Sequence, residues 1–590
     1  MLMSFFCGRN DNKKRFFAFV RSKRKSPCPP VINNHGEIIH KPDMISRMFG
    51  EYFNSVFVCP DIELPCAPPE CDFPHPPIKD VKISSCDIAK IIDNLQNDKS
   101  PGPDNITPRL LKSCSGVISP ILCNLFCRSL SQGELPSMWK KANITPVFKS
   151  GDTGLIQNYR PIALTSIVCK IMESVIASAV RSHLIDYMLL SPEQHGFVKG
   201  RSCVTQLINV TYDWLTILDK PCPPKIDAVF LDFAKAFDVM PHDVLLNKLA
   251  NQYNITGNIW KWIKSFVSGR DQRVLYRGSL SSWLPVSSGI PQGSVLGPLL
   301  FDLFINDLPL CTSSRCLLFA DDTLLYRPIT CLEDEVTLQQ DLDQIHGWCL
   351  KNRMCLNVNK TKVMRMTWSK HPGVPIYTIN NTHLEIVSDY KYLGVTLNNK
   401  LTWDTHVQYV VNKSNRMLGF IFSVARDLCQ NAKLALYKAI VLPILEYGQP
   451  VWHLYTATLI NKIEKVQRRA TRMILGQRRM EMSYENRLKL LNWSSLSSRR
   501  KFLLLSYVTK ALYGFIQCDV VRRGVSVNGR HTETVRFDHL RARTQRLHCS
   551  AVNVFARYWE ELPDSLRSGV AELTFKRWIS LLRCHVCQAE

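Results

Sequence analysis

The stretch Cys316-Leu-Leu-Phe-Ala-Asp-Asp-Thr-Leu-Leu-Tyr326 holds two short apolar runs that are separated only by Asp321 and Asp322. Two such runs predict a tight β-hairpin with both acids at its tip. A second apolar run, Ile226-Asp-Ala-Val-Phe-Leu-Asp232, is too short for a buried helix and also ends in a carboxylate. It predicts a central strand.

These acids lie next to apolar residues, where like charges are poorly solvated. Burying such charges costs several kcal/mol per ion unless cations compensate. Magnesium is bound by one or two protein carboxylates together with substrate phosphates, and Asp232 supplies a third acid beside Asp321 and Asp322. Two metal ions about 3.5–4 Å apart can activate a hydroxyl and stabilise a leaving pyrophosphate. Taken alone, Asp321-Asp322 is also compatible with an ordinary exposed turn, so the surrounding sequence has to decide.

The composition indicates which class of molecule the chain binds and in which cellular compartment it resides. The chain has 590 residues and a formal charge of +24, with 45% hydrophobic residues. A folded chain with this excess favours a polyanion, nucleic acid before an acidic membrane, although a solvated basic surface would give the same count. No apolar run is long enough to predict a membrane span. The 22 cysteines are scattered without a disulfide-like framework. An intracellular, reducing compartment is therefore expected.

Proline and charge patterns suggest the domain organisation. We expect residues 1–82 to form a basic and then proline-rich linker region, because seven prolines lie between Pro60 and Pro77. A compact region is expected from Ile83. Near the other end, Leu459 to Leu475 has apolar residues at helical spacing, and Lys462, Lys465, Arg469 and Arg472 repeat on another face.

Seven motifs follow one another along the chain. They are Asn158-Tyr-Arg-Pro-Ile-Ala-Leu-Thr165, His195-Gly-Phe-Val-Lys-Gly-Arg-Ser202, Phe230-Leu-Asp-Phe-Ala-Lys-Ala-Phe-Asp238, Ser288-Gly-Ile-Pro-Gln-Gly-Ser-Val-Leu-Gly-Pro-Leu299, Leu318-Phe-Ala-Asp-Asp322, Leu356-Asn-Val-Asn-Lys-Thr361 and Tyr392-Leu-Gly-Val-Thr396. Their order closely resembles the reverse transcriptase domain of jockey-like non-LTR retrotransposons (LINE-type elements). The resemblance covers roughly residues 83–400.

The resemblance implies an α+β right-hand polymerase fold with fingers, an antiparallel-sheet palm and a helical thumb, followed by a helical basic C-terminal region. Fingers and palm are expected in residues 83–400, the thumb in 401–500 and the C-terminal region, of underived role, in 501–590. The implied activity is RNA-directed DNA polymerisation, a nucleotidyl transfer that extends a DNA primer on an RNA template by target-primed reverse transcription. The implied cofactor is two Mg²⁺ ions, with Mn²⁺ as an alternative.

The implied partners are the RNA template, a DNA primer or target DNA and deoxynucleoside triphosphates, without a membrane. The oligomeric state stays open. An intracellular ribonucleoprotein, in the nucleus, the cytoplasm or both, is the expected form.

The resemblance also implies roles for single residues. Asp232, Asp321 and Asp322 match the catalytic, metal-binding acids, with Asp322 either a ligand or an acid that only shapes the local field. Lys360 matches a lysine assigned to protonate the leaving pyrophosphate, although a lysine can also lie near phosphates without transferring a proton. Lys149 and Arg160 match basic positions that face the triphosphate, although a role on the protein surface would also explain them. Phe237 matches the aromatic residue that rejects ribonucleotides, although core packing would also explain it. Gln292 and Gly293 belong to a loop beneath the templating base pair. Arg201 is a candidate for the template backbone, and the thumb stripe Lys462, Lys465, Arg469 and Arg472 for the duplex.

Asp238 is expected to be structural, as the cap of a helix that begins near Pro241.

The chain also departs from this family. Complete members normally carry an apurinic-type endonuclease ahead of the polymerase, and the roughly 80 residues present there are too few for one. The sequence therefore predicts a chain without that domain, whose target-site nicking is supplied by another molecule or is missing. The alternative to an enzyme is a catalytically silent relic that binds RNA.

Overall fold

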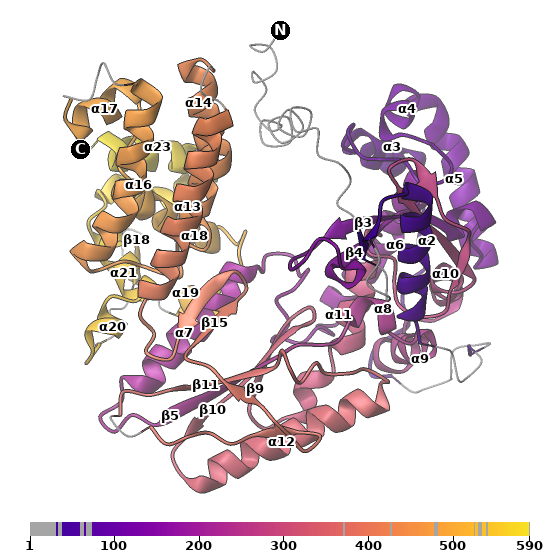
Figure 1. Cartoon of the computed structure of the whole chain (residues 1–590), viewed down its shortest axis with the longest axis horizontal. Coiled ribbons are helices and arrows are strands. Elements are labelled where there is room, and N and C mark those ends of the chain that lie inside the picture. The colour runs from indigo at the N-terminus through magenta and orange to yellow at the C-terminus, as the bar shows by residue number, and fades with distance from the viewer. Residues whose placement is uncertain are drawn as a thin grey trace.

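The computed structural model describes residues 31–32, 38–58, 64–65, 73–369, 372–424, 428–476, 482–523, 525–528, 534–537 and 541–588. Among these residues no helix is both long and apolar enough to cross a membrane. The basic stretch Arg9 to Lys25 lies outside the described residues. A five-stranded sheet, which we call the palm sheet, lies at the base of the molecule in Figure 1, between two taller groups of elements.

The palm sheet has the strand order β14-β11-β5-β10-β9, and all its neighbours are antiparallel except β11 and β14. Its strands are β5 (Lys225–Leu231), β9 (Arg315–Phe319), β10 (Asp322–Ile329), β11 (Lys362–Met366) and β14 (Glu385–Ile386). The central strand and the hairpin predicted from the sequence are therefore both confirmed. Only Ala320 and Asp321 separate the paired residues Phe319 and Asp322, so the turn is as short as predicted.

Both faces of the palm sheet are buried. Ala228 and Phe230 of β5 belong to one hydrophobic core, while Val229 and Leu231 belong to another. Successive side chains of a strand point to opposite faces, so a strand between two cores is apolar at nearly every position. This explains the apolar run from Ala228 to Leu231, while the buried Asp227 of the same strand is paired with Arg365.

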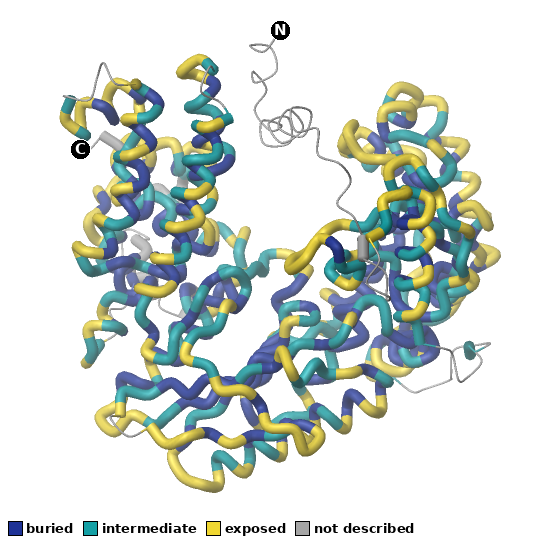
Figure 2. The backbone as a smooth tube through the Cα atoms, viewed as in Figure 1, coloured by how far each residue is buried: buried dark blue, intermediate teal, exposed yellow. Residues whose placement is uncertain are grey.

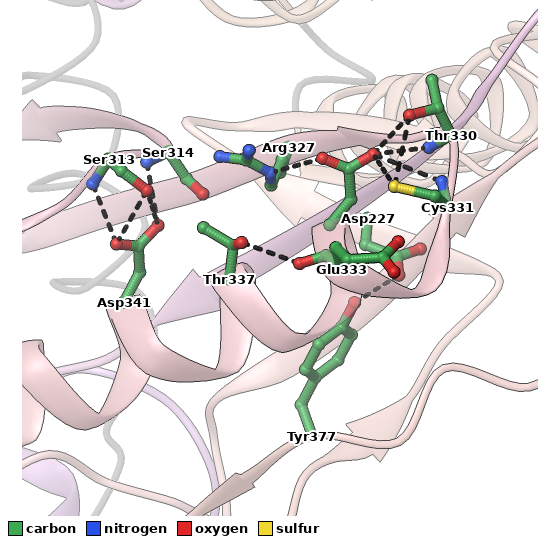
Figure 3. A network of polar contacts seen from close by, with 11 residues as sticks. Asp227, Ser313, Ser314, Arg327, Thr330, Cys331, Glu333, Thr337, Asp341 and Tyr377 are labelled. Carbon is green, nitrogen blue, oxygen red and sulfur yellow. Dashed lines mark hydrogen bonds and ion pairs between the residues drawn. The ribbon is translucent and has the colours of Figure 1, made fainter.

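The helices α7 (Cys203–Leu218) and α12 (Leu332–Lys351) both pack against β10. The ring of Trp214 in α7 meets that of Tyr326 edge-on at a centroid separation of 5.6 Å. Polar contacts anchor α12: Asp341 accepts hydrogen bonds from the backbone N–H groups of Ser313 and Ser314, both at 2.8 Å (Figure 3). At the start of the helix, Thr330 and Arg327 donate to the carboxylate of Asp334. These contacts fix α12 against the hairpin strands.

The group at the right of Figure 1 forms the fingers. Its elements are α2 (Pro42–Ser55), α3 (Ser85–Asp93), α4 (Pro108–Ser113), α5 (Ser115–Gln132), β3 (Lys141–Phe148), β4 (Tyr159–Leu164), α6 (Ile167–Asp186), α10 (Gly257–Val267), β6 (Arg270–Tyr276), β7 (Ser279–Leu280) and β8 (Leu284–Val286). The strands have the order β4-β3-β6-β7, with β8 also paired to β6. The short helices α8 (Ala236–Val239), α9 (His242–Tyr253) and α11 (Gly297–Ile305) lie between fingers and palm sheet.

Helix α2 differs from the expected linker over residues 1–82. Ile45, Phe49 and Phe53, spaced four residues apart, are buried and form a core with Ala142 and Val274 of the fingers strands. An apolar stripe of this spacing needs a partner surface, and the fingers sheet supplies it. Residues 42–55 therefore form part of the fingers, ahead of the proline-rich stretch.

The group at the left of Figure 1 contains the thumb and the C-terminal region. The thumb expected from residue 401 comprises α13 (Asp404–Val424), α14 (Gln430–Leu436), α15 (Leu442–Glu446), α16 (Ala457–Leu475) and α17 (Tyr484–Leu491). The hairpin of β15 (Asp389–Tyr392) and β16 (Val395–Asn398) connects β11 of the palm sheet to α13. The C-terminal region comprises α18 (Leu496–Leu512), α19 (Asp519–Arg523), β17 (Val525–Asn528), β18 (Thr534–Phe537), α20 (Gln545–His548), α21 (Ala551–Glu560), α22 (Asp564–Glu572) and α23 (Phe575–Gln588).

The thumb and the C-terminal region share one hydrophobic core. That core includes Ile463 of α16, Leu505 of α18 and Trp559 of α21, and it continues to Phe230 of the palm sheet. In Figure 2 buried segments occur both in the base and in the left group. The expected boundary near residue 500 therefore falls inside α18, within one packed unit.

Candidate active site

A cavity of about 440 Å³ opens where the end of the palm sheet meets the fingers. Seven of the side chains that the sequence singled out line it: Lys149, Arg160, Asp232, Phe237, Gln292, Asp321 and Lys360. They come from segments up to 211 residues apart in the chain, as the numbers 149 and 360 show. Asp322 and Gly293 do not line this cavity.

The strand register places the three acids at one end of the palm sheet. Thr323 of β10 pairs with Leu231 of β5, so Asp232 and Asp322 are the residues that follow this pair toward the tip. Asp321 occupies the hairpin turn after Ala320, whose backbone has a φ of 54°. A non-glycine residue in this left-handed region is strained unless its surroundings hold it.

Two of the acids, Asp321 and Asp322, have raised pKa values. Burial raises the pKa of Asp321, and the nearby charge of Asp232 adds to this effect, while Arg160 and Lys149 oppose it. Loss of surrounding water, followed by the charges of Asp321 and Asp232, raises the pKa of Asp322 to about 6. Burial and neighbouring negative charge therefore disfavour the ionised forms of Asp321 and Asp322, which a bound cation would offset.

Lys149 and Arg160 stand on the fingers side of the cavity. They lie at facing ends of β3 and β4, where Val147 pairs with Arg160 and the backbone N–H of Lys149 donates to Asn158 O at 2.8 Å. Both side chains are exposed. Two cations on a rigid strand pair, across the cavity from the acids, suit a phosphate chain that bridges the two sides.

Lys360 stands beside Asp232. Its Nζ lies 3.6 Å from Asp232 Oδ2, and both side chains reach solvent, so this ion pair is weak. The turn that carries Lys360 is attached to the acid: the backbone N–H of Asn357 donates to Asp232 O at 2.7 Å. The motif from Leu356 to Thr361 thus belongs to the site, where its lysine meets the first acid.

Phe237 both lines the cavity and packs against a neighbour. Its ring stacks on Phe301 of α11 with a centroid separation of 4.4 Å and an interplanar angle of 22°. The contact with Phe301 supports one side of the ring. A supported ring that reaches the cavity can limit the size of the sugar, so the two interpretations of Phe237 are compatible.

Asp238 does not cap α9, which begins at His242 without a side-chain cap. Its Oδ1 instead accepts a hydrogen bond from Gln292 Nε2 at 2.8 Å, and burial raises the pKa of Asp238 to about 6. The loop of Gln292 approaches the neighbouring backbones closely. A Cβ atom on Gly289 would lie 2.4 Å from Asp238 O, and one on Gly293 would lie 2.7 Å from Ala163 O. These glycines allow the loop to pack against α8 and β4.

Sequence reasoning missed one contributor, Tyr52 of α2. The Nζ of Lys235 lies 4.5 Å from the centre of its ring and donates to its hydroxyl at 3.0 Å. Tyr52 lines the same cavity. The spacing of Ile45, Phe49 and Phe53 was the signal for this helix, and the adjacent proline-rich stretch obscured it.

Arg201 is not directed toward the cavity. Its guanidinium donates to the backbone carbonyls of Pro192 and Gln194, each at 2.6 Å, and to Gln517 Oε1 at 3.2 Å. Burial lowers its pKa. The expected contact with the template backbone is replaced in this structure by contacts within the protein.

The thumb stripe lies on one face of α16, as predicted. Lys465, Arg469 and Arg472 are exposed, and Lys462 is half-buried. Arg469 leans toward α13, where its Nη1 is 3.5 Å from Asn415 Oδ1. In Figure 1, α13 stands closer to the fingers than α16 does. The stripe therefore forms a basic surface of the thumb that lies outside the cavity.

The acids suit a cation that is shared with a substrate. Among the described residues no three Asp, Glu, His or Cys side chains are grouped closely enough to hold a metal ion by themselves. Magnesium does not need such a group, because it takes one or two carboxylates and completes its shell with water and phosphate oxygens. Asp232 and Asp321 line one cavity, and burial raises the pKa of Asp321, so this donor set fits a cation.

Residues 140–397 match the family of reverse transcriptases (RNA-dependent DNA polymerases). The chain is 31% identical over 414 residues to the probable RNA-directed DNA polymerase from transposon BS of Drosophila melanogaster, covering 68% of this chain and 45% of that protein. It is 28% identical over 453 residues to the RNA-directed DNA polymerase from mobile element jockey of the same organism, covering 74% and 47%. The chain thus spans about half the length of these relatives.

A structure of apo telomerase from Candida tropicalis matches 50% of this chain and 67% of its own, at 11% identity and a TM-score of 0.32. That likeness is too low to support an inference.

Proposed function

Because the chain belongs to the reverse transcriptases of jockey-like non-LTR retrotransposons, we propose that it is an RNA-directed DNA polymerase. It extends a DNA primer on an RNA template by nucleotidyl transfer. The observation that carries this proposal is the cavity in which Asp232 and Asp321 face Lys149 and Arg160.

In this proposal the two sides of the cavity bind one nucleotide. Lys149 and Arg160 bind the triphosphate, and Asp232 and Asp321 would hold Mg²⁺, or Mn²⁺ in its place, with Asp322 adjusting the local field. A bound pair of these ions would acidify the primer 3′-hydroxyl and neutralise charge on the phosphates. Phe237 meets the sugar, and Lys360 stands near enough to Asp232 to donate a proton to the departing pyrophosphate.

The remaining parts of the assignment concern the nucleic acids. Gln292 orients the templating base pair from a loop that is fixed to Asp238. The basic face of α16 binds phosphates of the template–primer duplex, which gives affinity without sequence preference. Target-primed synthesis in a cell requires a nick in the target DNA.

Primer extension tests the proposal. The purified full chain, with a DNA primer, an RNA template, deoxynucleotides and Mg²⁺, should add nucleotides, and Asp321→Ala should reduce the rate by at least about 100-fold because one electrostatic partner of the transition state is lost. Asp93→Ala is the matched control, since Asp93 is an exposed acid at the end of α3. It should leave the rate unchanged.

RNA binding without any extension by the parent protein, over a range of salt and metal concentrations, would support the silent relic. Equal activity of the Asp321 variant and the Asp93 variant would remove the acids from the mechanism.

A further inference from the structure

The catalytic hairpin is supported from its outer side. Strand β9 is the last strand of the palm sheet on that side. A segment ahead of α7 covers this edge: Leu318 N donates to Glu193 O at 3.0 Å, and His195 N donates to Leu318 O at 2.9 Å. The pairing stops one residue before the hairpin turn. An unpaired strand edge beside the reacting acids is thereby avoided.

The side chain of Gln194 holds the turn itself. It is fully buried, and its Oε1 accepts hydrogen bonds from Gly196 N at 2.7 Å and from Ala320 N at 3.2 Å. Two converging N–H groups require an acceptor, which fixes the orientation of the amide. A Cβ atom on Gly196 would lie 2.4 Å from Ala320 N. The backbone of Ala320, the residue before Asp321, therefore packs directly against Gly196, and no side chain larger than hydrogen fits between them.

Arg201 connects this support to the C-terminal region. One nitrogen of its guanidinium donates to the carbonyls on both sides of Glu193, those of Pro192 and Gln194. Its Nε donates to Gln517 Oε1, and the backbone N–H of Gln517 donates to Gly200 O at 2.8 Å. Gln517 lies between α18 and α19, so a continuous series of hydrogen bonds runs from the C-terminal region to the hairpin turn.

We propose that the C-terminal region acts as a brace for the catalytic hairpin, with Gln517, Arg201 and Gln194 as positioning residues for Asp321. This inference rests on the proposed function, because it gives the brace its purpose. Ala320 has a left-handed backbone, and such a residue keeps its conformation only where neighbours hold it. Loosening the brace lets the turn relax and displaces the carboxylate that follows it.

Hydrogen–deuterium exchange of the metal-free full chain tests the brace without relying on activity. Gln517→Ala removes one contact from an exposed side chain, so the fold is retained. Arg201→Lys keeps the charge but loses the planar fork. Gln194→Met keeps the volume and loses the acceptor. Each should speed exchange of the peptide spanning residues 316–326.

The matched control is Asp219→Asn. Asp219 accepts from Arg543 N at 2.8 Å and Thr544 N at 2.7 Å, so it also joins the C-terminal region to α7, without contacting the hairpin. It should leave exchange of the hairpin peptide unchanged. Equal exchange of that peptide in the parent protein, Gln517→Ala and Arg201→Lys would overturn the brace.

Two further measurements distinguish the brace from a direct phosphate contact by Arg201. In primer extension, Arg201→Lys should raise the Mg²⁺ concentration needed for half-maximal rate and lower kcat by up to about 100-fold, since small displacements of reacting groups have effects of this order. The salt dependence of RNA binding should not change. If Arg201 instead contacts a phosphate, Arg201→Ala should reduce the slope of log K for RNA binding against log salt by about one and leave the Mg²⁺ requirement unchanged. That result would contradict the brace.

An inactive parent protein with fast hairpin exchange in the variants would refute the proposed function and retain the brace. An active parent with unchanged exchange and Mg²⁺ requirement in the variants would refute only the brace.

Discussion

The palm sheet and thumb helix α16 bury their apolar residues in different ways. Strand β5 sends Phe230 to one core and Leu231 to the other, and its buried acid Asp227 is paired with Arg365. Asp232 lies just beyond the end of this strand, where it reaches the cavity. Helix α16 buries Ile463 and Val466 on one face and leaves a broad polar face. A strand between two cores therefore fixes its terminal acid closely, whereas a helix with one buried face allows its cations several directions.

From this difference we expect a substitution near the palm to change one kinetic property strongly, such as sugar discrimination or KM for nucleotides. A substitution on the thumb should weaken duplex binding only slightly. Phe237→Ala should give the largest change among three such tests. Loss of the ring that lies against Phe301 opens space for the 2′-hydroxyl, and ribonucleotide incorporation should rise by about 10- to 100-fold relative to deoxynucleotides.

Competition between rNTP and dNTP in single-nucleotide incorporation measures this ratio. An unchanged ratio would assign Phe237 to packing alone.

Arg160→Ala should have the next largest effect. Its side chain lines the cavity on the fingers side, and loss of a charge-assisted contact with the triphosphate should raise KM for deoxynucleotides by about 10-fold or more, with a smaller change in kcat. Steady-state kinetics provide the measurement. Arg128→Ala is the matched control because Arg128 is an exposed arginine of α5 in the fingers and does not line the cavity. A rise in KM of the same size in both variants would contradict the assignment.

Lys465→Ala should have the smallest effect. One exposed phosphate contact fewer should weaken duplex binding a few-fold and reduce the slope of log K against log salt by about one. Binding titrations at several salt concentrations measure this slope. An unchanged slope, with KM for nucleotides also unchanged, would take the stripe of α16 out of duplex binding and direct attention to α13.

The same contrast explains how much the sequence could predict. The hairpin around Asp321 and the strand ending at Asp232 follow from local apolar patterns, because sheet geometry leaves few alternatives. The direction of Arg201 could not be predicted, since its partners Pro192 and Gln517 are 325 residues apart in the chain, as their numbers show. The role of Asp238 was missed because its partner Gln292 lies 54 residues further along the chain. From local sequence alone, a short polar side chain after an apolar motif fits a helix cap equally well.

Helix α2 shows a second limit. Its stripe of Ile45, Phe49 and Phe53 was visible, yet the proline-rich stretch after it led to the prediction of a linker. Prolines exclude helix and central strand only where they occur, and they carry no information about the residues ahead of them. Tyr52 lies far in sequence from the acids that line the same cavity, so its contribution was not predicted.

The central claim is that the palm acids are tolerated because cations and nucleotide phosphates share their cavity. The number of Mn²⁺ ions bound by the full chain, in complex with a chain-terminated primer, template and the next deoxynucleotide, tests it most directly by electron paramagnetic resonance titration. This claim predicts two tightly bound ions in the parent protein and loss of tight binding in Asp232→Ala/Asp321→Ala. Equal tight binding by the parent and the double variant would contradict it.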